Sequence, residues 1–254
     1  MNKKQNYSIF GLIAVICALV LLTCSFLMPP KPTYEVVNID ETQVNQNDTN
    51  VNTSNENNNQ QTYTGVVVLD PGHGGYDNGA SSADGRIVEK EFDLKIAMRV
   101  KTILESKGIK VILTRTNDNV SWPSDNGKDL QARLDIATNA NANLMVSIHC
   151  NVSDEDIYNV SGSEVYANAD QANSTSLAKS IVSELNNLKP EMPSRGVKTA
   201  KLHLTLFNKV PTVIVEMGFI SNPKDVEYLM NDVTQTKMVD AIANGILNYL
   251  KTDE

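Results

Sequence analysis

The 254-residue sequence contains little cysteine, histidine or tryptophan, with three, three and one of these residues. Three cysteines are too few for a secreted domain that depends on a dense set of disulfides. Basic residues are also in the minority, because 22 Lys and Arg stand against 30 Asp and Glu and give a formal net charge of −8. An acidic chain without a basic stripe is a poor nucleic-acid binder, so no nucleic-acid partner is expected. The hydrophobic content of 41% excludes a wholly disordered chain.

One long, uncharged, mostly apolar run covers residues 9–28 and follows Lys3 and Lys4. As a helix with a rise of ~1.5 Å per residue, it spans roughly the 30 Å hydrocarbon core of a bilayer. Basic residues before the run favour a cytoplasmic N-terminus. The sequence therefore predicts a cytoplasmic tip and single-pass membrane anchor over residues 1–28, with the remainder of the chain outside the membrane. Cleavage as a secretory signal peptide is the main alternative, and lipidation at Cys24 is a second.

The next segment, residues 29–64, begins with Pro29, Pro30 and Pro32 and continues as an Asn-, Gln- and Thr-rich stretch. Almost none of its residues could fill a hydrophobic core. This composition is typical of a disordered, flexible linker. The chain is therefore divided into an anchor over residues 1–28, a linker over 29–64 and one folded domain over 65–254.

Strand and helix patterns alternate within residues 65–254, which indicates an α/β fold. The sequence predicts strands at residues 66–69, 109–113, 144–148 and 212–215, and apolar runs at 66–69, 144–148 and 212–215 indicate that these three are buried. Alternation predicts a partly exposed strand at residues 163–167. Apolar residues at helical spacing predict helices, and these cover residues 92–107, 130–140, 177–188 and 238–250.

Potential metal ligands and acid–base groups follow three of the predicted strands. Asp70 and His73 come after the first strand, His149 follows the third strand along the chain, and Glu216 directly follows the strand at 212–215. The carboxyl ends of strands form the ligand crevice of open α/β sheets, so these side chains should lie close together. Catalytic zinc commonly has three N or O ligands from the protein and one water, and His₂Glu is one such set.

The third ligand should be an acid on the loop that follows His73, because this loop must pass over the same crevice. Glu89 and Glu91 are the two candidates. Glu216, at the end of a buried strand, is placed to act as general base towards water. Three further polar residues near strand ends are candidates for supporting the zinc ligands or contacting substrate, namely Asp70, Arg115 and Asn151.

Four ordered motifs carry a resemblance to a known family. They are Asp70-Pro71-Gly72-His73-Gly74-Gly75, Glu89-Lys90, Ser147-Ile148-His149-Cys150-Asn151 and Val215-Glu216-Met217-Gly218-Phe219-Ile220-Ser221-Asn222-Pro223. With these motifs, essentially all of residues 65–251 resembles the zinc-dependent N-acetylmuramoyl-L-alanine amidases, the group called amidase type 3. The resemblance implies a single catalytic domain with a mixed, mostly parallel sheet flanked by helices.

The same resemblance implies a site and a reaction. One Zn²⁺ ion would be bound by His73, Glu89 and His149, and Glu216 would be the catalytic acid–base. The implied substrate is bacterial peptidoglycan, cleaved at the amide bond between muramic acid and L-alanine. Asp93 and Cys150 depart from the usual family pattern, which has Asn and a small residue at these positions, and neither is expected to touch a ligand.

Two other functions stay open, a zinc peptidase acting within the stem peptide and a non-catalytic wall-binding protein. About a dozen residues separate Asn151 from the strand at 163–167, too few for the inserted helix that plugs the site of some relatives. The anchored, unplugged layout resembles germination-specific amidases of spore formers, so a role in the spore cortex stands beside division and growth. His203 is expected to be a surface or rim histidine, and Trp122 to cover the core.

Overall fold

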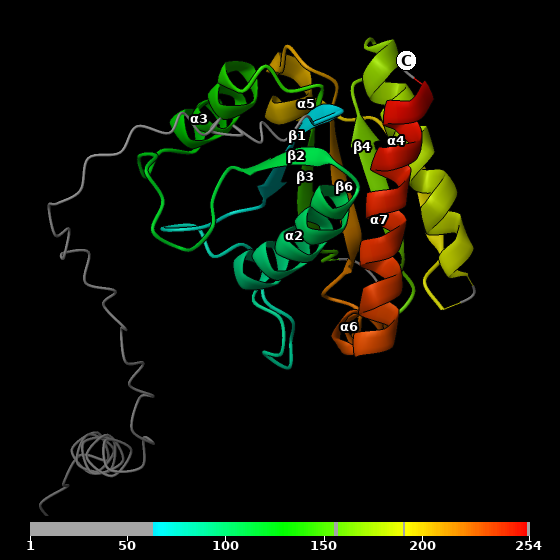
Figure 1. Ribbon diagram of the computed structural model, residues 1–254. Coiled ribbons are helices and arrows are strands. Elements are labelled where there is room, and N and C mark those ends of the chain that lie inside the picture. The colour runs from blue at the N-terminus through cyan, green and yellow to red at the C-terminus, as the bar shows by residue number, and fades with distance from the viewer. Residues whose placement is uncertain (1–62, 155–156, 190, 253–254) are drawn as a thin grey trace, which may run out of the picture. The chain divides into compact units, whose positions relative to one another are not determined.

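A six-stranded sheet in the order β2-β1-β3-β6-β4-β5 forms the centre of the domain in a computed structural model (Figure 1). Residues 63–154, 157–189 and 191–252 are described. The strands are β1 (Gly65–Pro71), β2 (Ile109–Leu113), β3 (Leu144–Asn151), β4 (Ser163–Ala167), β5 (Ser194–Lys198) and β6 (Thr212–Phe219). Neighbouring strands run parallel except β4, which is antiparallel to β6. The sheet is therefore mixed and mostly parallel, as the resemblance implied.

Helices cover both faces of this sheet (Figure 1). The larger core lies under α2 (Glu89–Ser106), α4 (Ala172–Leu185), α6 (Pro223–Met230) and α7 (Asp232–Thr252). The smaller core, on the other face, includes residues of α3 (Asn126–Asn139) and α5 (His203–Phe207). Alternation along β1 separates the two cores, because Val67 and Leu69 enter the larger one and Val68 enters the smaller one.

Every strand and helix predicted from the sequence is present; the strands at 109–113 and 163–167 have the predicted bounds, and the other elements differ at one or both ends. Three short elements, β5, α5 and α6, were not predicted. The strand predicted at residues 163–167 is present as β4, but its predicted partial exposure was wrong, since four of its five residues are buried. Helix α4 packs against β4, which lies between β6 and β5 in the sheet.

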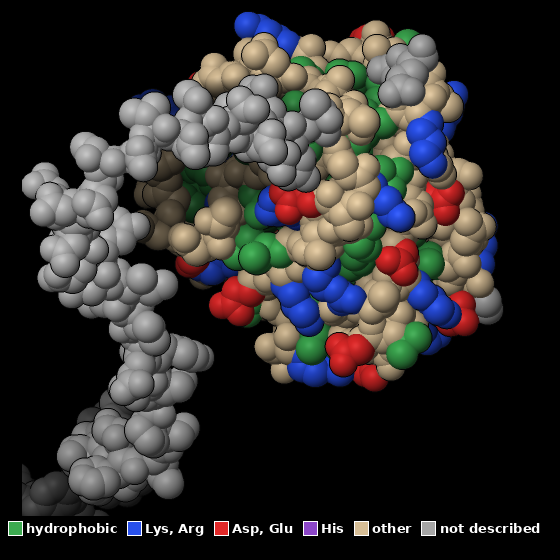
Figure 2. All heavy atoms as spheres, viewed as in Figure 1, with side chains coloured by type: hydrophobic (Ala, Val, Ile, Leu, Met, Phe, Trp, Pro, Cys, Tyr) green, Lys and Arg blue, Asp and Glu red, His purple; other side chains and the backbone are tan. Residues whose placement is uncertain are grey.

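The predicted anchor over residues 1–28 lies outside the described residues, as does the predicted linker over 29–64 apart from its last two residues. Within the described part of the chain, no helix combines the length and the apolar character that crossing a bilayer requires. On the face of the domain seen in Figure 2, Lys and Arg side chains are interspersed with Asp and Glu and form no basic stripe.

Helices α4 and α7 pack against each other at Gly245, where an added Cβ would lie 2.5 Å from Ile181 Cα. We expect Gly245→Ala to lower the free energy of unfolding by about 1–3 kcal/mol, because overpacking forces the two helices apart. Gly127→Ala in α3 is the control, since the nearest atom to its added Cβ is 3.6 Å away. Urea denaturation measures both variants, and a Gly245→Ala protein as stable as the wild type would contradict the prediction.

Candidate functional site

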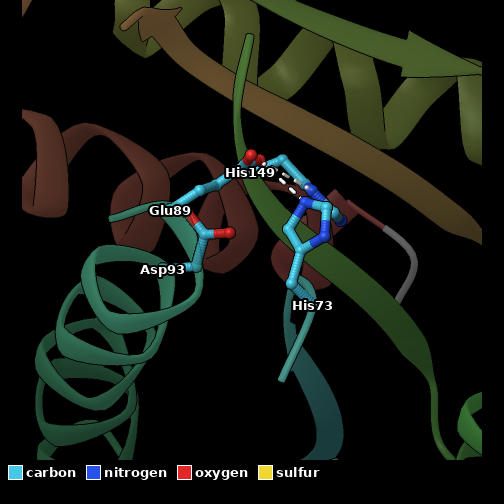
Figure 3. Close-up of side chains that lie close together, drawn as sticks. All are labelled: His73, Glu89, Asp93 and His149. Atoms are coloured by element: carbon cyan, nitrogen blue, oxygen red, sulfur yellow. Dashed lines mark hydrogen bonds and ion pairs between the residues drawn. The ribbon is translucent and has the colours of Figure 1, made fainter. Parts of the chain in front are cut away.

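Three of the predicted residues meet at the carboxyl ends of neighbouring strands (Figure 3). His73 lies on the loop after β1, Glu89 is the first residue of α2, and His149 lies near the end of β3. Glu89 Oε1 is 3.0 Å from His73 Nε2 and 3.2 Å from His149 Nδ1. Glu91, the alternative acid, is exposed and does not belong to this cluster. Together with Asp93, the three residues offer ligand atoms within 4.8 Å of one another, so they could bind a metal ion.

The chemistry of the donor atoms fits a divalent cation. Asp77 Oδ2 lies 2.8 Å from His73 Nδ1. When Nδ1–H donates to this carboxylate, the ring is held with Nε2 facing the cluster and free to coordinate, which is the usual arrangement of metal-bound histidine. Asp77 was not identified from the sequence, because its spacing from His73 has no meaning until the conformation of the loop is known.

Glu89 is held as a carboxylate in a fixed position. Its Oε2 accepts a hydrogen bond from the Ala80 backbone N–H at 2.8 Å, and its Oε1 accepts one from the Cys150 N–H at 3.1 Å. Burial raises the pKa of Glu89, but hydrogen bonds to His149 and His73 outweigh burial and lower this pKa below its ordinary value. The expectation that Cys150 touches no proposed ligand was therefore wrong, because its backbone contacts Glu89.

Asp93 also lies in the cluster, contrary to expectation. It is fully buried, one turn of α2 after Glu89, and Figure 3 shows the two side chains next to each other. Burial, followed by the charges of Glu89 and Glu216, raises the pKa of Asp93 well above its ordinary value. Burial likewise raises the pKa of the Cys150 thiol, so this cysteine is a poor nucleophile.

Glu216 lies on β6 between two residues of neighbouring strands. It is the register partner of His149 on β3 and of Glu164 on β4. Its Oε2 is buried and has no hydrogen-bond partner among the described residues. Burial is the main cause that raises the pKa of Glu216 to about 7, and the charges of Glu89 and Glu164 also raise it while His149 lowers it. A carboxyl group with this pKa is suited to both accept and donate a proton near neutral pH.

A cavity of about 240 Å³ adjoins Glu216 and His149. Its other lining residues are Leu130, Leu202, His203, Leu204 and Ile214. His203 is half-buried and lines this cavity, which agrees with the expected rim position. The alternation of apolar residues around it suggested extended backbone, but helix α5 begins at His203. The sequence contained no signal for this place in the cavity wall, since it depends on how α5 packs against β6.

Asp70 forms a buried ion pair with Arg133 of α3, and the two side chains are 0% and 2% exposed. Arg133 Nη1 donates to Asp70 Oδ1 at 2.8 Å, while Thr114 Oγ1 and Ser147 Oγ donate to the same carboxylate at 2.6 and 2.7 Å. Arg133 Nη2 also donates to the carbonyl of His73 at 2.7 Å. Asp70 therefore supports the loop that carries His73 and does not reach the metal cluster.

Arg115 and Asn151, the two remaining candidates, make mainly backbone contacts. Arg115 is buried, and it donates to the carbonyl oxygens of Pro71, Gly72 and Lys90 at 3.2, 2.6 and 2.6 Å. Asn151 is half-buried at the end of β3, where its side-chain oxygen accepts from the next backbone N–H at 2.8 Å. Trp122 is buried beneath the Arg133 guanidinium, as expected for a residue that covers the core.

Comparison with known proteins agrees with this architecture. Residues 67–248 match the family described as N-acetylmuramoyl-L-alanine amidase. The chain is 38% identical over 189 residues to the N-acetylmuramoyl-L-alanine amidase LytC of Bacillus subtilis, covering 73% of this chain and 36% of LytC. It is 30% identical over 191 residues to the germination-specific N-acetylmuramoyl-L-alanine amidase of the same organism, covering 72% and 79%.

Among solved structures, the CwlD amidase from Clostridioides difficile in complex with the GerS lipoprotein is 34% identical, with a TM-score of 0.68. The match covers 74% of this chain and all of that chain. The chain thus belongs to the N-acetylmuramoyl-L-alanine amidase family, although it spans only about a third of the length of LytC.

The raised pKa of Glu216 makes a prediction about stability. Its protonated form stabilises the metal-free fold below the ordinary pKa of 4.5, and this contribution is lost as the pH rises through about 7. Glu216→Gln stays neutral, so its stability relative to the wild type should increase by about 3 kcal/mol between pH 4 and pH 8. Urea denaturation of chelator-treated protein at both values measures this, and a difference that does not change with pH would refute the assigned pKa.

Proposed function

We propose that this protein is a zinc-dependent hydrolase that cleaves the peptidoglycan amide bond between the lactyl carbonyl of N-acetylmuramic acid and the nitrogen of L-alanine. The observation that carries the proposal is the convergence of His73, Glu89 and His149 beside Glu216, in a chain of the amidase family. Two imidazoles and one carboxylate form a donor set of catalytic zinc sites, whereas Mg²⁺ and Ca²⁺ favour oxygen ligands.

In this proposal, His73, Glu89 and His149 would hold the zinc ion, and Asp77 would keep His73 in the coordinating orientation. When bound, zinc would supply a Lewis acid that polarises the amide carbonyl and the attacking water. Glu216, as a carboxylate, accepts a proton from that water while the water oxygen bonds to the carbonyl carbon. Glu216 then donates the proton to the L-alanine nitrogen as the C–N bond breaks, which leaves a lactyl carboxylate and a free amine.

We further propose that residues 1–28 anchor the protein in the bacterial cell membrane and that the catalytic domain is extracytoplasmic. The uncharged run at 9–28 after two lysines supports this location. A flexible linker over residues 29–64 has a root-mean-square reach of ~33 Å, which suits a wall polymer next to the membrane. The complex of CwlD with the GerS lipoprotein supports the proposal that this chain also has a protein partner, and the germination-specific relative supports a role in the spore cortex.

The first test is mass analysis of the peptidoglycan fragments that the protein releases, with zinc and with a chelator. We expect free stem peptides that begin with L-alanine, and muramic acid left intact. Glu216→Gln should reduce the release at least about 100-fold, because the proton transfers of both steps are lost, while zinc content stays at one per chain.

Other fragments would identify the rival functions. Shortened stem peptides still attached to muramic acid would indicate a peptidase. Full zinc occupancy without any release by the wild type, alone or with extracts that supply a partner, would indicate a wall-binding protein. Glu91→Gln makes the same chemical change at an exposed residue of α2 outside the metal cluster, so this control should leave the release unaltered.

A second test concerns the anchor. We expect the full-length protein to stay with the membrane fraction after washing at alkaline pH, because about twenty apolar residues lie in the hydrocarbon core. Cys24→Ala should fractionate in the same way, since the anchor needs no lipid. A mature protein whose N-terminus lies beyond residue 28 would show instead that the segment is a cleaved signal peptide.

A further inference from the structure

Two polar atoms of the cavity beside the metal cluster have no hydrogen-bond partner within the described part of the chain. They are Glu216 Oε2 and His203 Nε2, and both are buried. Burying a polar atom without a partner costs free energy, so such atoms in a cavity wall are candidates for ligand contact. The mechanism already uses Glu216, whereas His203 has no role in it.

The ring of His203 contacts an aromatic side chain of its own helix. It is the first residue of α5, and it lies against Phe207 with ring centroids 4.7 Å apart and an angle of 54° between the planes. Helix α5 packs on α3 and β6, which carry two further lining residues, Leu130 and Ile214. His203 is therefore a polar group on a cavity wall, and its lining neighbours apart from His149 and Glu216 are all aliphatic.

The position of Glu216 indicates which part of the substrate enters this cavity, and this step rests on the proposed function. Glu216 must reach the nitrogen that leaves, so the residue that bears this nitrogen lies nearest to it. That residue is L-alanine, whose methyl group suits walls made by Leu202, Leu204 and Ile214. A volume of about 240 Å³ is below the range of roughly 300–1,000 Å³ typical of drug-sized ligands, so a residue with its peptide group fits better than a disaccharide.

We propose that His203 binds the first peptide group of the stem peptide. Its Nε2–H donates a hydrogen bond to the carbonyl oxygen of L-alanine. This contact, one residue away from the bond that breaks, keeps the departing nitrogen directed towards Glu216. His203 thereby selects stem peptides in which L-alanine is joined to the next residue by an ordinary peptide bond.

The test compares two variants on two soluble substrates. His203→Phe keeps a ring but removes the donor, and His203→Gln restores an N–H donor near the position of Nε2. One substrate is a muramoyl tetrapeptide, and the other is its analogue in which a methylene group replaces the carbonyl of L-alanine. Loss of one hydrogen bond in a desolvated site predicts that His203→Phe lowers kcat/KM on the natural substrate by about 10- to 100-fold. His203→Gln should stay within about threefold of the wild type.

The analogue separates substrate contact from a merely structural role. In the wild type it should be cleaved about 10- to 100-fold less efficiently than the natural substrate, whereas His203→Phe should cleave the two at similar rates, because both changes remove the same hydrogen bond. The proposal would be overturned if the analogue lowered kcat/KM by the same factor in the wild type and in His203→Phe. An unchanged kcat/KM for His203→Phe on the natural substrate would also overturn it.

Failure of the proposed function has a different signature. If the wild type releases no stem peptide while Glu216→Gln and wild type behave alike, the amidase reaction itself is refuted. If the wild type is active and His203→Phe unfolds or loses zinc, the comparison moves to His203→Gln. His203→Gln should still cleave the analogue less efficiently than the natural substrate. A folded His203→Gln protein that cleaves both equally well would overturn the proposed contact.

Discussion

The buried ion pair between Asp70 and Arg133 is the interaction on which the geometry of the site depends. Two fully buried charges are tolerated only when their remaining hydrogen-bonding groups are satisfied, and removal of one partner leaves the other uncompensated. Here the remaining donors of Arg133 reach Asp129 and the carbonyls of Pro71 and His73. The pair therefore joins α3 to the loop after β1 and fixes the backbone from which the His73 side chain projects.

Arg115 has a parallel role in holding the same loop. Its guanidinium donates to the carbonyl of Gly72 and to the carbonyl of Lys90 in the first turn of α2. Because Glu89 precedes Lys90, one side chain holds the positions of two cluster residues that are far apart in the sequence. The tight turn also needs Gly72, since an added Cβ would lie 2.3 Å from the ring of His149. The backbone carbonyls of this irregular loop accept hydrogen bonds from buried arginines, whereas in a regular strand they would pair with a neighbouring strand.

The positions that the sequence could predict are those that follow from strand periodicity. His149 and Glu216 end apolar runs, and parallel strands bring such ends to one edge of the sheet. Asp77 and His203 could not be predicted in this way, because their positions depend on loop conformation and on the packing of a five-residue helix. Asp93 was noticed only as an unusual residue. Its distance from Glu89 follows from helical spacing, but its complete burial depends on tertiary packing.

The sheet order has an electrostatic consequence that links fold and chemistry. Since β6 lies between β3 and the antiparallel β4, Glu216 has an imidazole on one side and Glu164 on the other. Arg195 forms an ion pair with this second carboxylate. Glu89 adds negative charge from α2, and the three carboxyl groups lie in a partly desolvated site where their repulsion is strong. A divalent cation bound by the two histidines and Glu89 would offset that repulsion, so the arrangement that brings the pKa of Glu216 close to neutral without a metal ion would also favour metal binding.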